Sequence, residues 1–418
     1  MSLVILLGIS SVALASEPYE YPFTDPLVAT ILGTPAQYRA SLPAKIPVKE
    51  MSLTVYENRS IPEIFWYQDR LRFSLAYQKQ EAPLIFVIAG TGVDYNGPTM
   101  QLLQKAFFKA GFHVVCLSSP TCPNFIITAS GTMVPGDLAA DSADLYRVMH
   151  LAWDIMKSKI RVSSFYLTGY SLGGAQAAFI ARLDEDKKLF NFKKVLLINP
   201  PLSLYSSANT LDAMLEQNIP GGLDNFNAFF DDMMRRFSEV YRSMGFIDFN
   251  EDFLYAVFQE YPLKREELAA IIGLSFRFAS GSMMFTSDVM THAGFIVPRN
   301  RVLSISDSLT DYLKVCFRTS FNDYINQMFL PFFSARKPGL TFQELINDSS
   351  LKSIDSYLRE SDKIGLVTNA DDFLYAPGEL DYLRGVFASK AKIYPHGGHC
   401  GNMAYRDNVT YMINFFKN

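Results

Sequence analysis

Apolar runs of strand length alternate with helical patterns along this chain, and the alternation constrains the fold more than any other feature. Residues 83–90 (PLIFVIAG), 112–119 (FHVVCLSS) and 193–200 (KKVLLINP) are largely apolar segments next to Gly or Pro. Amphipathic helical patterns at 99–111 and 136–159 lie between them. Buried strands joined by helices imply right-handed crossovers and a mostly parallel sheet with helices on both faces. The sequence therefore predicts an α/β fold.

The alternation stops at about residue 201 and returns at residues 363–369 (KIGLVTN). The segment between these points has no short Val-rich strand and carries Phe- and Met-rich helical patterns, such as 223–246 and 307–333. We therefore expect a helical insertion between two strands of the sheet. The predicted organisation is a signal peptide (1–15), an extended N-terminal arm (16–50), a core (51–200 and 362–418) and a helical cap or lid (201–361).

The first residues have the composition of an export signal. Val4 to Leu14 form a short apolar core, and the run Ala13-Leu14-Ala15 fits the small-x-small cleavage pattern before Ser16. Because no Lys or Arg precedes the apolar core, a buried strand or helix is the alternative. We favour the signal peptide and expect an extracytoplasmic protein, periplasmic or secreted.

Composition excludes several functional classes. The net charge is −4 and no dense Lys/Arg stripe occurs, so electrostatic binding of nucleic acid has no support. The sequence has no C-x-x-C or H-E-x-x-H spacing, so we expect no metal and no cofactor. The four cysteines permit disulfides without proving them. Contact with a membrane or envelope surface and the oligomeric state stay open.

A serine between glycines, in the run GYSLGG, lies between a strand pattern and an Ala-rich helical pattern. Gly169-Tyr170-Ser171-Leu172-Gly173 matches G-x-S-x-G, which displays a nucleophilic serine when a strand precedes it and a helix follows. The alternative is a tight turn that only needs small residues. The helix N-terminus behind the serine would favour a developing negative charge.

Candidate acids and bases follow two later strand patterns. Asp371 and Asp372 come directly after 363–369, and His396 and His399 follow the next strand pattern, 391–395. Because parallel strands end at the same edge of a sheet, these side chains are expected near Ser171. Nucleophilic catalysis by serine needs a base and a carboxylate that orients the base.

This constellation resembles the α/β-hydrolase fold, whose triad follows the chain order Ser, Asp/Glu, His. The resemblance covers roughly residues 50–200 and 362–418, and in that family a cap or lid is inserted after the sixth strand. It implies Ser171 as the nucleophile and the backbone N–H groups of Leu172 and Thr91 as the oxyanion hole. The run AGTG at 89–92 replaces the His-Gly pair common in this loop.

The resemblance also ranks the candidate acids and bases. Family acids often close a four-residue turn after their strand, and the fourth position counted from Asn369 is Asp372, so Asp372 is favoured over Asp371. The run GGHCGN is similar to the family's histidine loop, so His399 is the predicted base. His396, which follows Pro395, is interpreted as a solvated loop residue.

A fold of this kind serves many reactions, so the substrate must come from the site. The Phe- and Met-rich insertion would roof the serine with apolar surface, although helix packing alone needs the same residues. We predict an esterase- or lipase-like serine hydrolase that cleaves a small-molecule or lipid-like ester or thioester with an apolar acyl portion. One alternative is a serine aminopeptidase in which Asp231 and Asp232 hold the substrate amine. The other is a non-catalytic envelope binding protein.

Overall fold

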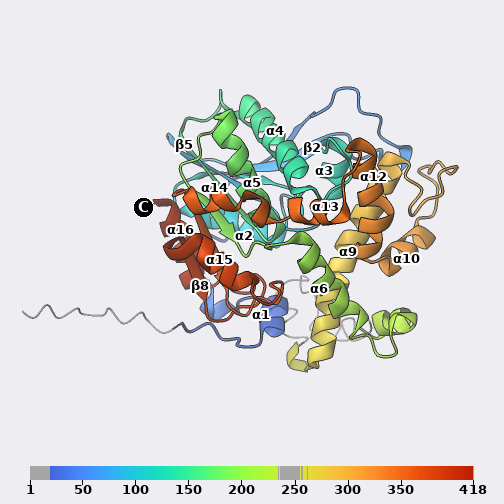
Figure 1. The fold of residues 1–418 in the computed structure, drawn as a ribbon. Coiled ribbons are helices and arrows are strands. Elements are labelled where there is room, and N and C mark those ends of the chain that lie inside the picture. Colours follow the sequence, from blue (N-terminus) through green and yellow to red (C-terminus); the bar gives the residue numbers. More distant parts are fainter. Residues whose placement is uncertain (1–18, 234, 236–254, 256–257, 261, 418) are drawn as a thin grey trace, which may run out of the picture.

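The computed structural model describes residues 19–233, 235, 255, 258–260 and 262–417. Within these residues, eight strands form one sheet in the order β1-β2-β4-β3-β5-β6-β7-β8 (Figure 1). Only β2 runs against the others, because it pairs antiparallel with both β1 and β4. The strands are β1 (Val48–Leu53), β2 (Leu71–Ala76), β3 (Ala82–Ile88), β4 (His113–Leu117), β5 (Val162–Tyr170), β6 (Val195–Ile198), β7 (Ile364–Asn369) and β8 (Ala391–Tyr394).

Helices cover both faces of the sheet, which confirms the predicted α/β fold (Figure 1). The central strand β3 shows why: Leu84, Phe86 and Ile88 pack toward the helices on one face, whereas Ile85 and Val87 pack toward the helices on the other. Alternate residues of a strand point to opposite faces, so a strand buried on both sides must be apolar throughout. The core helices are α2 (Pro98–Lys109), α3 (Pro123–Thr128), α4 (Leu138–Met156), α5 (Leu172–Lys187), α15 (Glu379–Phe387) and α16 (Arg406–Lys417).

Between β6 and β7, the part of the chain that the structure describes forms helices and short helical turns and no strand. Most of these elements gather beside the sheet, at the right of Figure 1, whereas the last of them, α14 (Asp355–Glu360), lies next to α15 at the left. The helical pattern expected over 223–246 lies mostly outside the described residues. The elements are α6 (Leu204–Glu216), η3 (Leu223–Asn225), α9 (Arg265–Thr291), α10 (Thr310–Arg318), α11 (Phe321–Tyr324), the π-turn η4 (Ile325–Phe329), α12 (Leu330–Arg336), α13 (Phe342–Asp348), η5 (Leu351–Ile354) and α14 (Asp355–Glu360).

A buried ion cluster joins the two inserted helices α6 and α9. Arg277 of α9 is fully buried and donates to Asp212 (2.7 Å) and Glu216 (2.9 Å) of α6. The second Asp212 oxygen accepts the backbone N–H of Phe321 at 2.6 Å. Breaking such a pair leaves an uncompensated buried charge, so the cluster fixes these helices together. Among the described helices, α9 alone has the length and composition to cross a membrane, and 61% of that apolar segment is buried inside the protein.

The N-terminal region differs from its prediction. The predicted signal peptide, residues 1–15, lies outside the described residues. The arm predicted as extended contains the helix α1 (Pro26–Leu32), because the Asp25 carboxylate caps the N–H groups of Leu27 and Val28 and Gly33 ends the helix at φ 64°. The arm also holds the short turn η1 (Ala36–Tyr38), and the sheet begins within its predicted bounds, at Val48.

Candidate active site

Ser171 occupies a sharp turn between β5 and α5. Its backbone is in an unusual conformation, φ 52° and ψ −127°, and its N–H donates to the Ile198 carbonyl on the neighbouring strand β6 (2.8 Å). A Cβ atom at Gly173 would lie 2.4 Å from the Ile88 carbonyl oxygen, so only glycine lets α5 approach the sheet this closely. The G-x-S-x-G pattern therefore forms a strained strand-to-helix turn that displays the serine.

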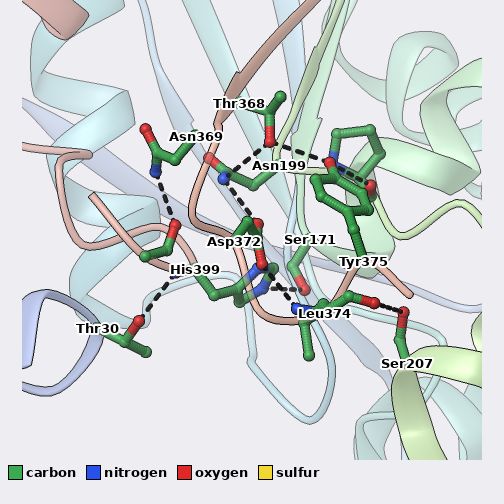
Figure 2. A network of polar contacts seen from close by, with 12 residues as sticks. Thr30, Ser171, Asn199, Ser207, Thr368, Asn369, Asp372, Leu374, Tyr375 and His399 are labelled. Atoms are coloured by element: carbon green, nitrogen blue, oxygen red, sulfur yellow. Dashed lines mark hydrogen bonds and ion pairs between the residues drawn. The ribbon is translucent and has the colours of Figure 1, made fainter. Parts of the chain in front are cut away.

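Three of the predicted side chains form one hydrogen-bonded line (Figure 2). His399 Nε2 lies 2.9 Å from Ser171 Oγ, and His399 Nδ1 lies 2.9 Å from Asp372 Oδ2. With a neutral imidazole, Nδ1–H donates to the carboxylate and Nε2 accepts from the serine hydroxyl. This is the geometry that activates a serine as a nucleophile.

The places of these residues in the sheet decide the fold family. Ser171 follows β5 in the middle of the parallel sheet, Asp372 follows β7 and His399 follows β8, all at the carboxyl edge. This is the chain order Ser, Asp, His on an α/β sheet, with the serine on a strand-to-helix elbow. The chain has the α/β-hydrolase fold.

Comparison with known proteins finds similarity among solved structures. The sequence matches no protein-family model and no curated protein. A hyperthermophilic esterase from Pyrobaculum calidifontis is 14% identical with a TM-score of 0.43, and 89% of this chain and 86% of that chain are covered. A thioesterase domain from the curacin biosynthetic pathway is 12% identical with a TM-score of 0.41, covering 89% of this chain and 100% of that chain. A proline iminopeptidase from Mycobacterium smegmatis is 12% identical with a TM-score of 0.41, covering 88% and 98%.

Asp372 is held by groups that were not among the predicted site residues. Asn199, directly after β6, donates from Nδ2 to Asp372 Oδ2 (2.9 Å) and to Thr368 Oγ1 (3.2 Å). The backbone N–H of Leu374 donates to Asp372 Oδ1 (3.1 Å). These bonds fix the orientation of the carboxylate toward the imidazole. The sequence signal that could have identified Asn199 is its position: it is a polar residue directly after an otherwise apolar strand.

The neighbouring carboxylate, Asp371, faces a different partner. Its oxygens accept the backbone N–H groups of Gly397 (3.2 Å) and Gly398 (2.9 Å), so it shapes the histidine loop and does not touch the imidazole of His399. Of the two candidate acids, the structure brings only Asp372 against the histidine. His396 differs from its interpretation as a solvated residue, because it is half-buried and its Nδ1 lies 2.8 Å from the Phe23 carbonyl of the N-terminal arm.

The N-terminal arm supports His399 directly. Thr30 of α1 accepts the His399 backbone N–H at 2.9 Å, as Figure 2 shows. The same hydroxyl donates to the Pro26 carbonyl (2.7 Å). A Cβ atom at Gly398 would lie 2.2 Å from the Pro26 carbonyl oxygen, so the helix and the loop are in close contact. The arm therefore helps to position the imidazole.

The charged groups around His399 raise the pKa of its imidazole. Burial lowers the pKa of the His399 imidazole, but the Asp372 carboxylate and the adjacent Cys400 outweigh burial and hold this pKa well above its usual value. All four cysteines, including Cys400, are free thiols. In the described part of the chain, no cluster of His, Cys, Asp or Glu side chains has the arrangement of a metal site.

The predicted oxyanion donors lie next to Ser171. Leu172 is the first residue of α5, where a backbone N–H has no partner within the helix. Thr91 lies in a turn closed by the Val93 N–H bonding to the Gly90 carbonyl (3.1 Å). The turn is tied down by Thr121, whose hydroxyl accepts the Gly92 N–H at 2.8 Å. Thr121 was not among the predicted site residues, because nothing local in the sequence links it to the turn.

A cavity of about 430 Å³ opens over Ser171 and His399. Its walls are mainly apolar and come from α1, α6 and α9, with Ile31, Leu211 and Ile272 among them. Of the described residues that line it, none is Asp or Glu. Asp231 is exposed away from these walls, and Asp232 pairs with Arg235 at 2.6 Å. Neither aspartate is among the described residues that line the cavity.

Proposed function

We propose that the protein is a serine hydrolase that cleaves an ester or thioester with an apolar portion. One observation carries the proposal: the line Ser171–His399–Asp372 ends at the floor of an apolar cavity. A non-catalytic binding protein has no need for a strained serine aligned with a base and a buried acid. The absence of a carboxylate among the described walls argues against recognition of a free amine.

The chemistry follows from the geometry. His399 Nε2 removes the hydroxyl proton while Ser171 Oγ forms a bond to the carbonyl carbon of the substrate. The Leu172 and Thr91 N–H groups would stabilise the resulting oxyanion. The protonated His399, stabilised by Asp372, then gives its proton to the leaving oxygen or sulfur as that bond breaks. Water attacks the acyl-enzyme by the same route and regenerates the free serine.

Labelling with a fluorophosphonate tests the proposal. We expect Ser171 to be the labelled residue, and Ser171→Ala to abolish both labelling and ester hydrolysis. The matched control is Ser158→Ala, which removes a hydroxyl from an exposed position. Labelling that persists in Ser171→Ala, or wild-type protein that is neither labelled nor active on any ester, would refute it.

We also propose that the protein is exported and acts outside the cytoplasm. The proposal rests on the apolar core at residues 4–14 and on the Ala-x-Ala pattern that ends at Ala15. N-terminal sequencing of the protein from its native source should give a first residue at or close to Ser16. An intact N-terminus would refute the export proposal and leave the hydrolase proposal unaffected.

A further inference from the structure

Ser171 lies where two cavities of very different size meet. The larger, about 430 Å³, is lined by His399 and Cys400 as well as by the apolar walls described above. The smaller, about 70 Å³, is lined by Leu172 and by buried side chains that include Ala208, Met283 and Phe321. Five described residues line both cavities: Thr91, Ser171, Leu211, Phe276 and Leu374. A substrate whose carbonyl group is bound at Ser171 can therefore extend into the two cavities on its two sides.

The position of the base assigns one part of the substrate to each cavity. The leaving atom must receive its proton from His399 Nε2, so the leaving group extends on the side of the imidazole. His399 lines the larger cavity and is not among the residues that line the smaller one. The leaving group therefore belongs in the larger cavity, and the acyl group in the smaller one.

The volumes limit what each cavity holds. An apolar cavity of about 150 Å³ accommodates a benzene ring, which corresponds to roughly 25 Å³ per carbon atom. At that density the small cavity accepts about three carbon atoms beyond the carbonyl, and the large one accepts a group of more than ten. The small cavity cannot expand easily, because Met283 and Phe321 are packed within a hydrophobic cluster of the inserted helices.

We propose that the substrate is a short-acyl ester or thioester of a large apolar alcohol or thiol. This inference rests on the proposed function and moves the apolar portion, which the sequence analysis assigned to the acyl group, to the leaving group. The Ser171 Oγ–carbon bond forms as the bond to the leaving group breaks, and His399 protonates the released alkoxide or thiolate. The products are an apolar alcohol or thiol and, after water attacks, an acid of about two to four carbons.

Two ester series test the assignment with the intact protein. In the first, 4-nitrophenyl esters vary from acetyl to decanoyl, and we expect kcat/KM to fall at least tenfold beyond about four acyl carbons. In the second, acetate esters of linear alcohols vary from ethyl to dodecyl, and kcat/KM should rise up to fourfold per added methylene until the cavity is full. A rise with acyl length together with a flat response to alcohol length would overturn the inference.

A pair of variants separates the two cavities. Met283→Ala enlarges the small cavity, so the ratio of octanoyl to acetyl activity should rise at least fivefold. The matched variant Ile272→Ala enlarges the large cavity, so it should change the dependence on alcohol length and leave the acyl ratio within twofold. Thermal unfolding checks that both variants fold. Should either not fold, Leu204→Ala, which lines only the small cavity, and Ile31→Ala, which lines only the large one, provide a second pair. Equal changes in both ratios would contradict separate cavities.

The two proposals fail in different ways. If fluorophosphonate labels Ser171 and long-acyl esters are the better substrates, the hydrolase proposal holds and the cavity assignment is wrong. If neither ester series is hydrolysed and Ser171 is not labelled, the hydrolase proposal fails and the assignment fails with it.

Discussion

The sheet and the inserted helices build two halves of the site with different interactions. At the edge of the sheet, hydrogen bonds of 2.9 Å join Ser171, His399 and Asp372, and Asn199 extends the line. The half formed by α6 and α9 presents mainly apolar side chains to the same space. Hydrogen bonds fix atoms to within tenths of an ångström, whereas apolar walls fix only shape and volume. Under the proposed function, the reaction and the choice of substrate depend on separate parts of the chain.

Helix α1 contributes to both halves. Thr30 accepts a hydrogen bond from the histidine loop and lines the cavity, and the next residue, Ile31, adds an apolar side chain to the same wall. The two adjacent residues therefore allow the comparison to be tested within a single turn of helix. Changes at the sheet edge should reduce turnover for every substrate, and changes at the walls should alter preference among substrates.

The largest effect is expected for Asp372→Asn. The amide cannot stabilise the imidazolium or hold the correct tautomer, so kcat should fall by about 10⁴-fold for short and long esters alike. Asp371→Asn is the matched control, because it changes only bonds to the loop backbone, and it should cost no more than about tenfold. Steady-state kinetics on two esters measure both. A reversed ranking would make Asp371 the acid.

The pH dependence tests the same half of the site. His399 must be neutral to accept the serine proton, and its pKa is raised. The fall of kcat/KM toward acid pH should therefore have its midpoint above about 6.5, the usual pKa of histidine. In Asp372→Asn the carboxylate that favours the protonated form is gone. The acid limb of the residual activity should then move to lower pH. An unchanged limb would show that Asp372 does not set the pKa.

A smaller effect is expected for Thr30→Val, which keeps the shape of the side chain and removes the acceptor of the His399 N–H. We expect kcat to fall about tenfold with KM unchanged for all esters, because an unpaired buried N–H costs roughly 1–3 kcal/mol. Thr30→Ser restores the hydroxyl and should recover most of the activity. A loss of activity confined to large substrates would mean that Thr30 acts through the cavity wall and not through the histidine loop.

The smallest effect is expected for Ile31→Ala. Removing part of the apolar wall should raise KM by a few fold for esters with a large leaving group, at about 0.8 kcal/mol per methylene that loses its contact. Ethyl acetate, whose leaving group does not reach the wall, serves as the internal control. An equal loss for both esters would mean that Ile31 acts on the histidine loop and not on the cavity.

The sequence predicted the elements whose signals are local and missed the contacts that are not. The run at 83–90 is apolar because both faces of β3 are buried, and the glycines around Ser171 are required by close backbone approach. Helix α1 was missed although its signals were present, since Asp25 before Pro26 and Gly33 after Leu32 mark a helix start and stop. The bonds that Asn199 and Thr30 make to the site span 173 and 369 residues, and no local pattern encodes them.

The contact between α1 and Gly398 has an evolutionary consequence. Because a side chain at position 398 would collide with the Pro26 carbonyl, a chain that keeps the helix must also keep the glycine. Homologues that lack the helix are released from this collision, and only the backbone conformation at φ 58° still favours glycine or asparagine there. A larger residue at this position would then show, from sequence alone, which lineages lack the helix.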